Sequence, residues 1–169
     1  MARFEVFKQL NKERKVMSIF KNFIVLLLVF SIGNVFAKEH QVKMLNGTAP
    51  DMFVFEPAVL KINKGDTVTW TGDAMHNSAS IKEMLPKGAK PWMGKLTKKA
   101  GEKSISVKFD IEGLYGYNCT PHAMFAMVGL VVVGDPSSNA EVAKAAAKKI
   151  EGKFAASKGR FTKYLLEVK

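Results

Sequence analysis

Cysteine is almost absent from this sequence of 169 residues, because Cys119 is the only one. A single thiol cannot form a disulfide within one chain, so the fold cannot depend on internal disulfides. Histidine is nearly as scarce, with three residues in the whole sequence. A run of about 20 apolar residues, the length of a membrane-spanning helix, is also lacking. The sequence therefore excludes a disulfide-rich scaffold and leaves few soft metal ligands to consider.

The N-terminal region has the pattern of a leader sequence. Residues 22–37 carry no charge, follow a basic region and end in small residues. This order is typical of a secretory signal peptide, and we expect it to be removed by cleavage after Ala37. A retained membrane anchor is the alternative, although the apolar run is short for a span. Met17 is a second candidate for the start of translation.

Acidic residues are the minority among the charged residues, with 15 Asp and Glu against 26 Lys and Arg. Residues 38–169 keep 20 basic and 13 acidic residues, a net charge of +7. Such a surface suits nucleic acid, an anionic membrane or an acidic protein. Export argues against nucleic acid, and the lysines are spread along the chain. We expect either a solvated basic surface or a docking patch for an acidic protein.

Alternation of apolar and polar residues predicts several half-buried strands. The segments with this pattern are residues 41–44, 67–71, 104–111 and 115–119. Residues 128–133 are continuously apolar and precede the turn 134–136, which predicts a buried central strand. We therefore predict an all-β domain, a sandwich or a barrel, over residues 38–135.

Two regions depart from the strand pattern. Residues 82–103 are rich in Lys, Gly and Pro and are expected to form an irregular excursion. Residues 136–169 are rich in Ala and Lys, and we predict two short helices that pack on the same domain, the first capped by Ser138 or Asn139. The expected apolar faces are Val142, Ala146, Ile150 and Phe154, then Phe161, Leu165 and Val168. Binding to a membrane surface is the weaker alternative for this extension.

The scarce soft side chains gather in the sequence CTPHAMFAM, residues 119–127. Cys119 and His122 are close enough to point into one volume from a tight turn, and Met127 follows five residues later. His76 lies in a polar loop after a predicted strand, and a sandwich brings such loops together at one end. His40 lies near the expected mature N-terminus, where order is poor. His76 is therefore the candidate that completes a His₂Cys set.

One thiolate, two imidazoles and a weak thioether form the ligand set of an electron-transfer copper site. Zinc is the less suitable metal, because a thioether binds it poorly and its structural sites take four strong ligands. Each residue alone has an ordinary structural interpretation: a buried thiol, a surface imidazole, a methionine in the core. In combination they predict one copper ion held by His76, Cys119, His122 and Met127. Met124 is the rival for the thioether position.

The sequence resembles the cupredoxins and, among them, the pseudoazurins. The resemblance extends from about Val42 into the C-terminal tail and rests on several segments and on the Cys-x₂-His-x₄-Met spacing. The segments are VKMLNG (42–47), FEPAVLKINKGDTVT (55–69), HNSASIKEMLPKGA (76–89), CTPH (119–122) and AMVGLVVVGD (126–135). It implies a Greek-key cupredoxin β-sandwich with two short C-terminal α-helices and one type 1 copper bound by the four residues above.

The resemblance also implies a function. It implies a periplasmic protein that shuttles single electrons between redox proteins, for example to a nitrite reductase. We expect a soluble monomer that is not an enzyme, and the lysines predict partners with acidic docking surfaces. His122 would be the exposed exit for the electron, within an apolar collar, and the backbone N–H of Asn77 would hydrogen-bond the sulfur. The expected collar is Pro121, Ala123, Met124 and Phe125, and the expected steering lysines are Lys43, Lys82, Lys87, Lys90 and Lys95.

Some residues depart from the pseudoazurin pattern. Lys43 stands where a histidine is usual, Met75 replaces a small residue before the first ligand, and Phe53 lies where a methionine can approach the exposed histidine. Trp92 and Met93 make the excursion more apolar. The main alternative function is a copper chaperone or store, which exposed methionines would suit. No Ser-His-Asp set or carboxylate pair stands out, so the sequence does not indicate an enzyme.

Overall fold

The computed structural model describes residues 13–14, 17 and 37–168. Of the predicted signal peptide, residues 1–37, only residues 13–14, 17 and 37 are described, and the rest lies outside the described residues. Residues 37–169 form one compact unit. Among the described residues no helix has the length and apolar character needed to cross a membrane.

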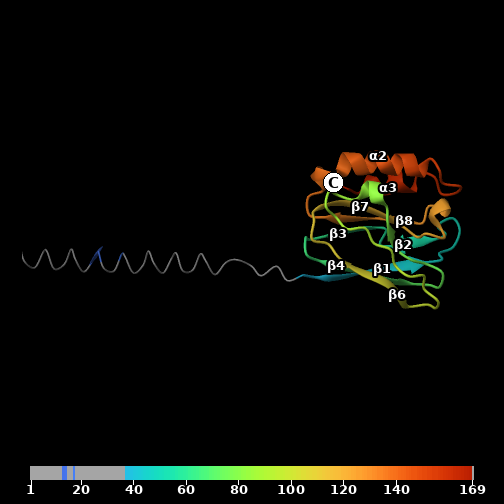
Figure 1. The fold of residues 1–169 in the computed structure, drawn as a ribbon, viewed down its shortest axis with the longest axis horizontal. Helices are drawn as coiled ribbons and strands as arrows, with labels where there is room; N and C mark the ends of the chain where they lie inside the picture. Colours follow the sequence, from blue (N-terminus) through green and yellow to red (C-terminus); the bar gives the residue numbers. More distant parts are fainter. Residues whose placement is uncertain (1–12, 15–16, 18–36, 169) are drawn as a thin grey trace, which may run out of the picture. The chain divides into compact units, whose positions relative to one another are not determined.

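Two four-stranded sheets form a sandwich, and the predicted all-β fold is confirmed (Figure 1). The sheet that we call the outer sheet has the order β2-β1-β4-β6. Its strands are β1 Glu39–Leu45, β2 Val54–Glu56, β4 Thr67–Gly72 and β6 Glu102–Lys108. Strand β1 runs parallel to β4 and antiparallel to β2, while β4 and β6 are antiparallel. Its buried residues alternate with exposed ones, because only one face meets the core.

The sheet that we call the inner sheet has the order β3-β8-β7-β5. Its strands are β3 Val59–Ile62, β5 Ala79–Ser80, β7 Gly113–Asn118 and β8 Val128–Val133. Every residue of β8 is buried, as the continuous apolar run predicted. Strand β8 pairs with β7 antiparallel and with β3 parallel, so it is a central strand.

The inner sheet is buried on both faces because helices cover the side that faces away from the outer sheet (Figure 1). These helices are α2 Ala140–Glu151 and α3 Arg160–Leu165. Between the two sheets lies an aromatic-rich core that includes Trp70, Tyr117 and Phe109. A second apolar layer joins the inner sheet to the helices through Leu130, Phe161 and their neighbours. Single 3₁₀ turns lie at η1 Lys82–Met84, η2 Ala123–Phe125 and η3 Pro136–Ser138.

The apolar face predicted for the first helix is partly wrong. Val142 is 67% exposed, and the buried residues of α2 are Ala143 and Ala147. The other three residues predicted for this face are buried or partly buried, as expected. Small side chains let α2 lie close to the inner sheet, so alanine rather than valine occupies the contact. Phe161 of the second predicted face is buried as expected.

Asn139 lies at the start of α2, as predicted, but its side chain does not cap the helix. Its Oδ1 accepts a hydrogen bond from the backbone N–H of Leu114 at 2.8 Å, and its Nδ2 donates to the Leu114 carbonyl at 2.8 Å. The amide therefore pairs with the backbone of β7 and fixes the start of the helical extension to the inner sheet.

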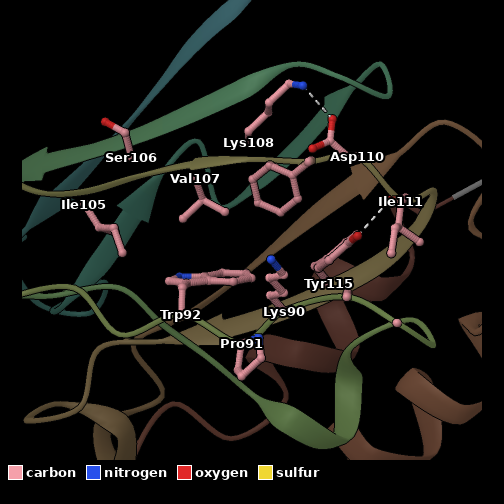
Figure 2. A pocket seen from close by; sticks show the side chains of 13 residues that line it. Lys90, Pro91, Trp92, Ile105, Ser106, Val107, Lys108, Asp110, Ile111 and Tyr115 are labelled. Atoms are coloured by element: carbon pink, nitrogen blue, oxygen red, sulfur yellow. Dashed lines mark hydrogen bonds and ion pairs between the residues drawn. The ribbon is translucent and has the colours of Figure 1, made fainter.

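The excursion after β5 covers the open edge between the sheets, beside β6. A groove of about 450 Å³ remains there. In Figure 2 the Trp92 ring lies between Pro91 and the side chains of Ile105 and Val107. Tyr115 closes the groove, and its hydroxyl donates to the Ile111 carbonyl at 2.7 Å. None of the predicted copper ligands lines this groove.

Candidate metal centre

Strands β7 and β8 position two of the predicted ligands on either side of one loop. The last residues of the ladder, Asn118 and Val128, face each other, so Cys119 directly follows β7 and Met127 directly precedes β8. The Cys119 N–H donates to the Met127 carbonyl at 3.0 Å and continues the pairing. The His122 carbonyl in turn accepts from the Met127 N–H at 3.2 Å, which closes the loop.

His76 reaches the same place from the outer sheet, in the loop that follows β4. Thr97 fixes its backbone: the Thr97 N–H donates to the His76 carbonyl at 2.9 Å, and the Thr97 hydroxyl lies 3.1 Å from the His76 N–H. His76 and Thr97 are both fully buried. Met75, the preceding residue, has a left-handed backbone with φ 69°, which turns the chain into the site.

The structure brings three of the four predicted ligands within bonding range of one point. The Cys119 Sγ lies 3.6 Å from the Nδ1 atom of His76 and 3.5 Å from that of His122, and the two Nδ1 atoms are 3.2 Å apart. The point equidistant from these atoms lies about 2.0 Å from each, close to a metal–imidazole bond length. A thiolate and two imidazoles in this arrangement fit a trigonal copper site.

Met127 is the better of the two thioether candidates. Met127 is fully buried in the same apolar cluster as Cys119, whereas Met124 is 53% exposed. The backbone of Met127 is hydrogen-bonded to both Cys119 and His122. A weak fourth ligand in a type 1 site must be held in place by the fold, and the burial of Met127 and its bonds to Cys119 and His122 suit that role.

The hydrogen bond made by Nε2 of His76 determines that its other ring nitrogen, Nδ1, is free to bind metal. His76 Nε2 lies 2.9 Å from Oδ1 of Asn46, and an amide oxygen can only accept, so Nε2 carries the proton. The lone pair of His76 is thereby placed on Nδ1, which points at the sulfur. Asn46 is a functional residue that the sequence did not reveal, because Asn46-Gly47 has the ordinary signature of a turn.

Burial adjusts all three titrating groups. Burial lowers the pKa of His76, and the nearby charge of His122 lowers it further. Burial also lowers the pKa of His122. Both imidazoles are therefore held in the neutral form that binds metal. Burial raises the pKa of the Cys119 thiol, while the backbone N–H groups of Asn77 and His122 favour the thiolate. A metal cation would supply the charge that this buried thiolate otherwise lacks.

Asn77 acts through its side chain as well as its backbone. Its Oδ1 accepts from the Thr120 N–H at 2.8 Å, and its Nδ2 donates to the Gly94 carbonyl at 3.1 Å. Asn77 therefore ties the loop that carries His76 to the loop that carries Cys119, which a simple turn residue would not do.

His122 is the half-buried ligand, as expected for an exit to the surface. Its ring stacks on that of Phe53, with centroids 4.0 Å apart and an angle of 9° between the planes. Two members of the predicted collar, Met124 and Phe125, are 53% and 45% exposed beside it. The result is an apolar surface around one edge of the site.

Comparison with known proteins places the chain in a family. A model of the copper-binding proteins of the plastocyanin/azurin family matches residues 42–134. The chain belongs to this family, the cupredoxins, whose members carry electrons. Within it the chain is similar to pseudoazurins, as the sequence motifs indicated.

Two pseudoazurin sequences and one solved pseudoazurin structure illustrate the similarity. The one from Methylorubrum extorquens is 44% identical over 109 residues, which are 64% of this chain and 70% of the relative. The one from Paracoccus pantotrophus is 40% identical over 112 residues, 66% of this chain and 74% of the relative. The crystal structure of the pseudoazurin from Methylobacterium extorquens AM1 superimposes with a TM-score of 0.63 at 36% identity, covering 78% of this chain and 99% of the other. The predicted fold and cofactor are thereby confirmed: a cupredoxin sandwich whose site fits one type 1 copper.

Proposed function

We propose that this copper electron-transfer protein works in the periplasm and exchanges single electrons with other redox proteins. The observation that carries the proposal is the triangle of His76 Nδ1, Cys119 Sγ and His122 Nδ1, with sides of 3.2 to 3.6 Å. Copper, when bound, supplies one-electron chemistry between Cu(II) and Cu(I). We assign His76, Cys119, His122 and Met127 as its ligands.

The protein contributes a rigid and dry ligand set. His76, Cys119 and Met127 are fully buried, and each is tied to its surroundings by backbone hydrogen bonds. A site that cannot rearrange imposes nearly the same geometry on both oxidation states, so little reorganisation accompanies each transfer. His122 reaches the surface within the apolar collar, which suits brief contact with many partners.

The proposed partners are proteins with acidic docking surfaces, among them a nitrite reductase or another periplasmic oxidoreductase. Lys43, Lys82 and Lys90 are exposed and remain candidates for steering. Lys95 pairs with Glu102 at 2.7 Å, so part of its charge is balanced within the protein. Lys87 lines a hollow with Glu112 and Asp135, at the far end of β7 and β8 from the site, and is not part of the proposed patch.

A visible spectrum tests the ligand assignment directly. Copper(II) added to the protein should give an intense thiolate-to-copper band that ascorbate bleaches reversibly. Cys119→Ala should abolish the band while the far-ultraviolet circular dichroism stays unchanged. A colourless wild-type protein, or a band that survives in the variant, would contradict the assignment. Transfer rates to a nitrite reductase that fall as ionic strength rises would support acidic partners.

A copper chaperone or store is the second candidate, because Met75 and Met93 are exposed beside the site, at 59% and 66%. Met93 Sδ lies 3.6 Å from Nδ2 of Asn77. A chaperone would release copper rapidly to a competing chelator, whereas a carrier should retain it through many redox cycles. Release within seconds would favour the chaperone.

A further inference from the structure

Arg160, the first residue of α3, is buried and makes no ion pair with a buried acid among residues 37–168. Its exposed fraction is 7%, and the nearest carboxylate, Asp51 at 3.8 Å, is itself 80% exposed. A buried guanidinium is tolerated only where its N–H groups find acceptors. Here the acceptors belong to the backbone of loops at the copper end of the sandwich.

A single nitrogen of Arg160 joins two of these loops. Nη1 donates to the carbonyl oxygens of Met52 at 3.2 Å and Phe53 at 3.0 Å, in the segment before β2. It also donates to the carbonyl of Ala126 at 3.0 Å, in the loop between His122 and Met127. The segment that precedes β2 and the ligand loop are thus held to each other through one side chain of the helical extension.

The backbone conformations at these contacts are unusual. Phe53 and Ala126 have φ angles of 53° and 57°, and Ser157, whose hydroxyl lies 3.3 Å from Nη2 of Arg160, has φ 51°. Among the residues of 37–168 that are not glycine, Met75 is the one other residue with a positive φ. Left-handed backbone is unfavourable for residues with a Cβ and persists where the surroundings hold it. Arg160 therefore contacts three of the four such residues in this part of the chain.

Two of these residues act directly on the candidate site. Phe53 stacks on the ring of His122. Ala126 ends the turn η2, so its conformation sets how the chain passes from His122 to Met127. The extension binds this loop a second time, because the Ala155 N–H donates to the Met124 carbonyl at 2.8 Å. The geometry at Arg160 therefore reaches both ends of the ligand loop.

We propose that Arg160 is a positioning residue for the copper site. It fixes Phe53 against His122 and holds the turn before Met127, so that the half-buried ligand keeps its place when the metal changes charge. The inference rests on the proposed function for its effect on copper. The clamp itself is a property of the protein without metal and can be tested separately.

Three variants separate positioning from simple attachment of the extension. Arg160→Met removes every donor but keeps an unbranched apolar stem. Arg160→Lys keeps the charge, although a lysine lacks the planar fork that reaches several carbonyls at once. Thr162→Val is the matched control, because it breaks the bond between the Thr162 hydroxyl and Glu151 that joins α3 to α2 without touching the loops.

The first measurement is amide hydrogen exchange on the copper-free protein. The N–H groups of Phe53 and Met127, bonded to Asn46 and His122, should exchange at least about tenfold faster in Arg160→Met and to a lesser degree in Arg160→Lys. Thr162→Val should leave them at the wild-type rate. Unchanged exchange in folded Arg160→Met overturns the clamp, and so does equal acceleration in Thr162→Val. If Arg160→Met does not fold, the test passes to Arg160→Lys. Exchange of these two N–H groups at the wild-type rate in that variant overturns the clamp.

The second measurement is on the copper-loaded protein. Loss of copper to a chelator should be about tenfold faster in Arg160→Met than in the wild type, the size seen when groups that orient ligands are removed. The position or relative intensity of the thiolate-to-copper band should change as well. Wild-type release and spectrum in a folded Arg160→Met overturn the effect on the site. A wild-type protein without the band contradicts the proposed function, while the exchange experiment still decides the clamp.

Discussion

The outer and inner sheets of this sandwich have four strands each but differ in how they are covered. Strands β1 and β4 of the outer sheet bury at most every second residue, as in β1 with Val42 and Met44. Strands β7 and β8 of the inner sheet are buried almost throughout, because the helical extension covers their second face. Two proposed ligands, Cys119 and Met127, adjoin these strands, and His76 comes from the outer sheet. The more deeply enclosed sheet thus borders two of the proposed ligands, and the outer sheet supplies a third.

The largest effect is expected when a lysine is placed on the face of each sheet that points away from the other sheet. Leu130 of β8 is fully buried under the helices, so Leu130→Lys should cost more than about 4 kcal/mol of the free energy of unfolding. Thr69 lies on the open face of β4 and makes an exposed hydrogen bond to Ser106. Thr69→Lys should change stability by only about 0.5 kcal/mol. Urea unfolding of both variants is the measurement, and similar losses would contradict the comparison.

A smaller effect is expected inside the inner sheet at Gly129. This residue faces Tyr117 on β7, and a Cβ there would lie against the Tyr117 ring. Gly129→Ala should destabilise the protein by about 1–3 kcal/mol, because the buried ring must shift within a packed core. Ser106→Ala on the outer sheet is the control and should be nearly neutral. Thermal unfolding measures the effect. If Gly129→Ala melted at the wild-type temperature, Gly129 would not be needed to make room for the Tyr117 ring.

The link from the outer sheet to the site can be weakened at Asn46. Asn46→Ala removes the acceptor for His76 Nε2 and should reduce copper affinity about tenfold, which corresponds to about 1.4 kcal/mol. Gln41→Ala is the control, since Gln41 makes an exposed hydrogen bond to Thr71 on the same sheet. Competition with a chelator measures both. Equal affinities in the two variants would mean that Asn46 does not orient His76.

The smallest predicted effect is a loss of stability at acidic pH, and it arises at Asp66, beside the start of β1. Hydrogen bonding from the Lys38 N–H lowers the pKa of the buried Asp66 carboxyl, partly opposed by burial and assisted by His40. A lowered folded pKa means that stability is complete above the unfolded pKa of about 3.9 and is lost as the pH falls through the folded value.

Unfolding should therefore become easier below about pH 4 in the wild type, and less so in Asp66→Asn, which does not titrate. Denaturant unfolding at several acidic pH values measures the two slopes. Hydrogen exchange should show β1 opening before β8. Parallel pH curves for the two proteins would contradict the role of Asp66.

The sequence predicted more of the inner sheet and the ligands than of the groups that hold them. Residues 128–133 and the spacing from Cys119 to Met127 are local patterns with direct physical meanings. Asn46 and Arg160 could not be found in this way, because each acts on residues far away in the sequence. Val142 was wrongly predicted to lie on the buried face of α2. Helical periodicity marks it as apolar but cannot tell which small residues, here Ala143 and Ala147, allow the closest approach to the sheet.

The bond between Lys38 and Asp66 has a consequence for maturation. In the chain described above, Lys38 offers a neutral amide N–H, 2.8 Å from the Asp66 carboxylate. Cleavage after Ala37, the position predicted from the sequence, would turn that same nitrogen into an ammonium group. A hydrogen bond in which only the acceptor is charged would then become an ion pair. Processing would in this way leave the exported domain with a stronger first strand than its precursor.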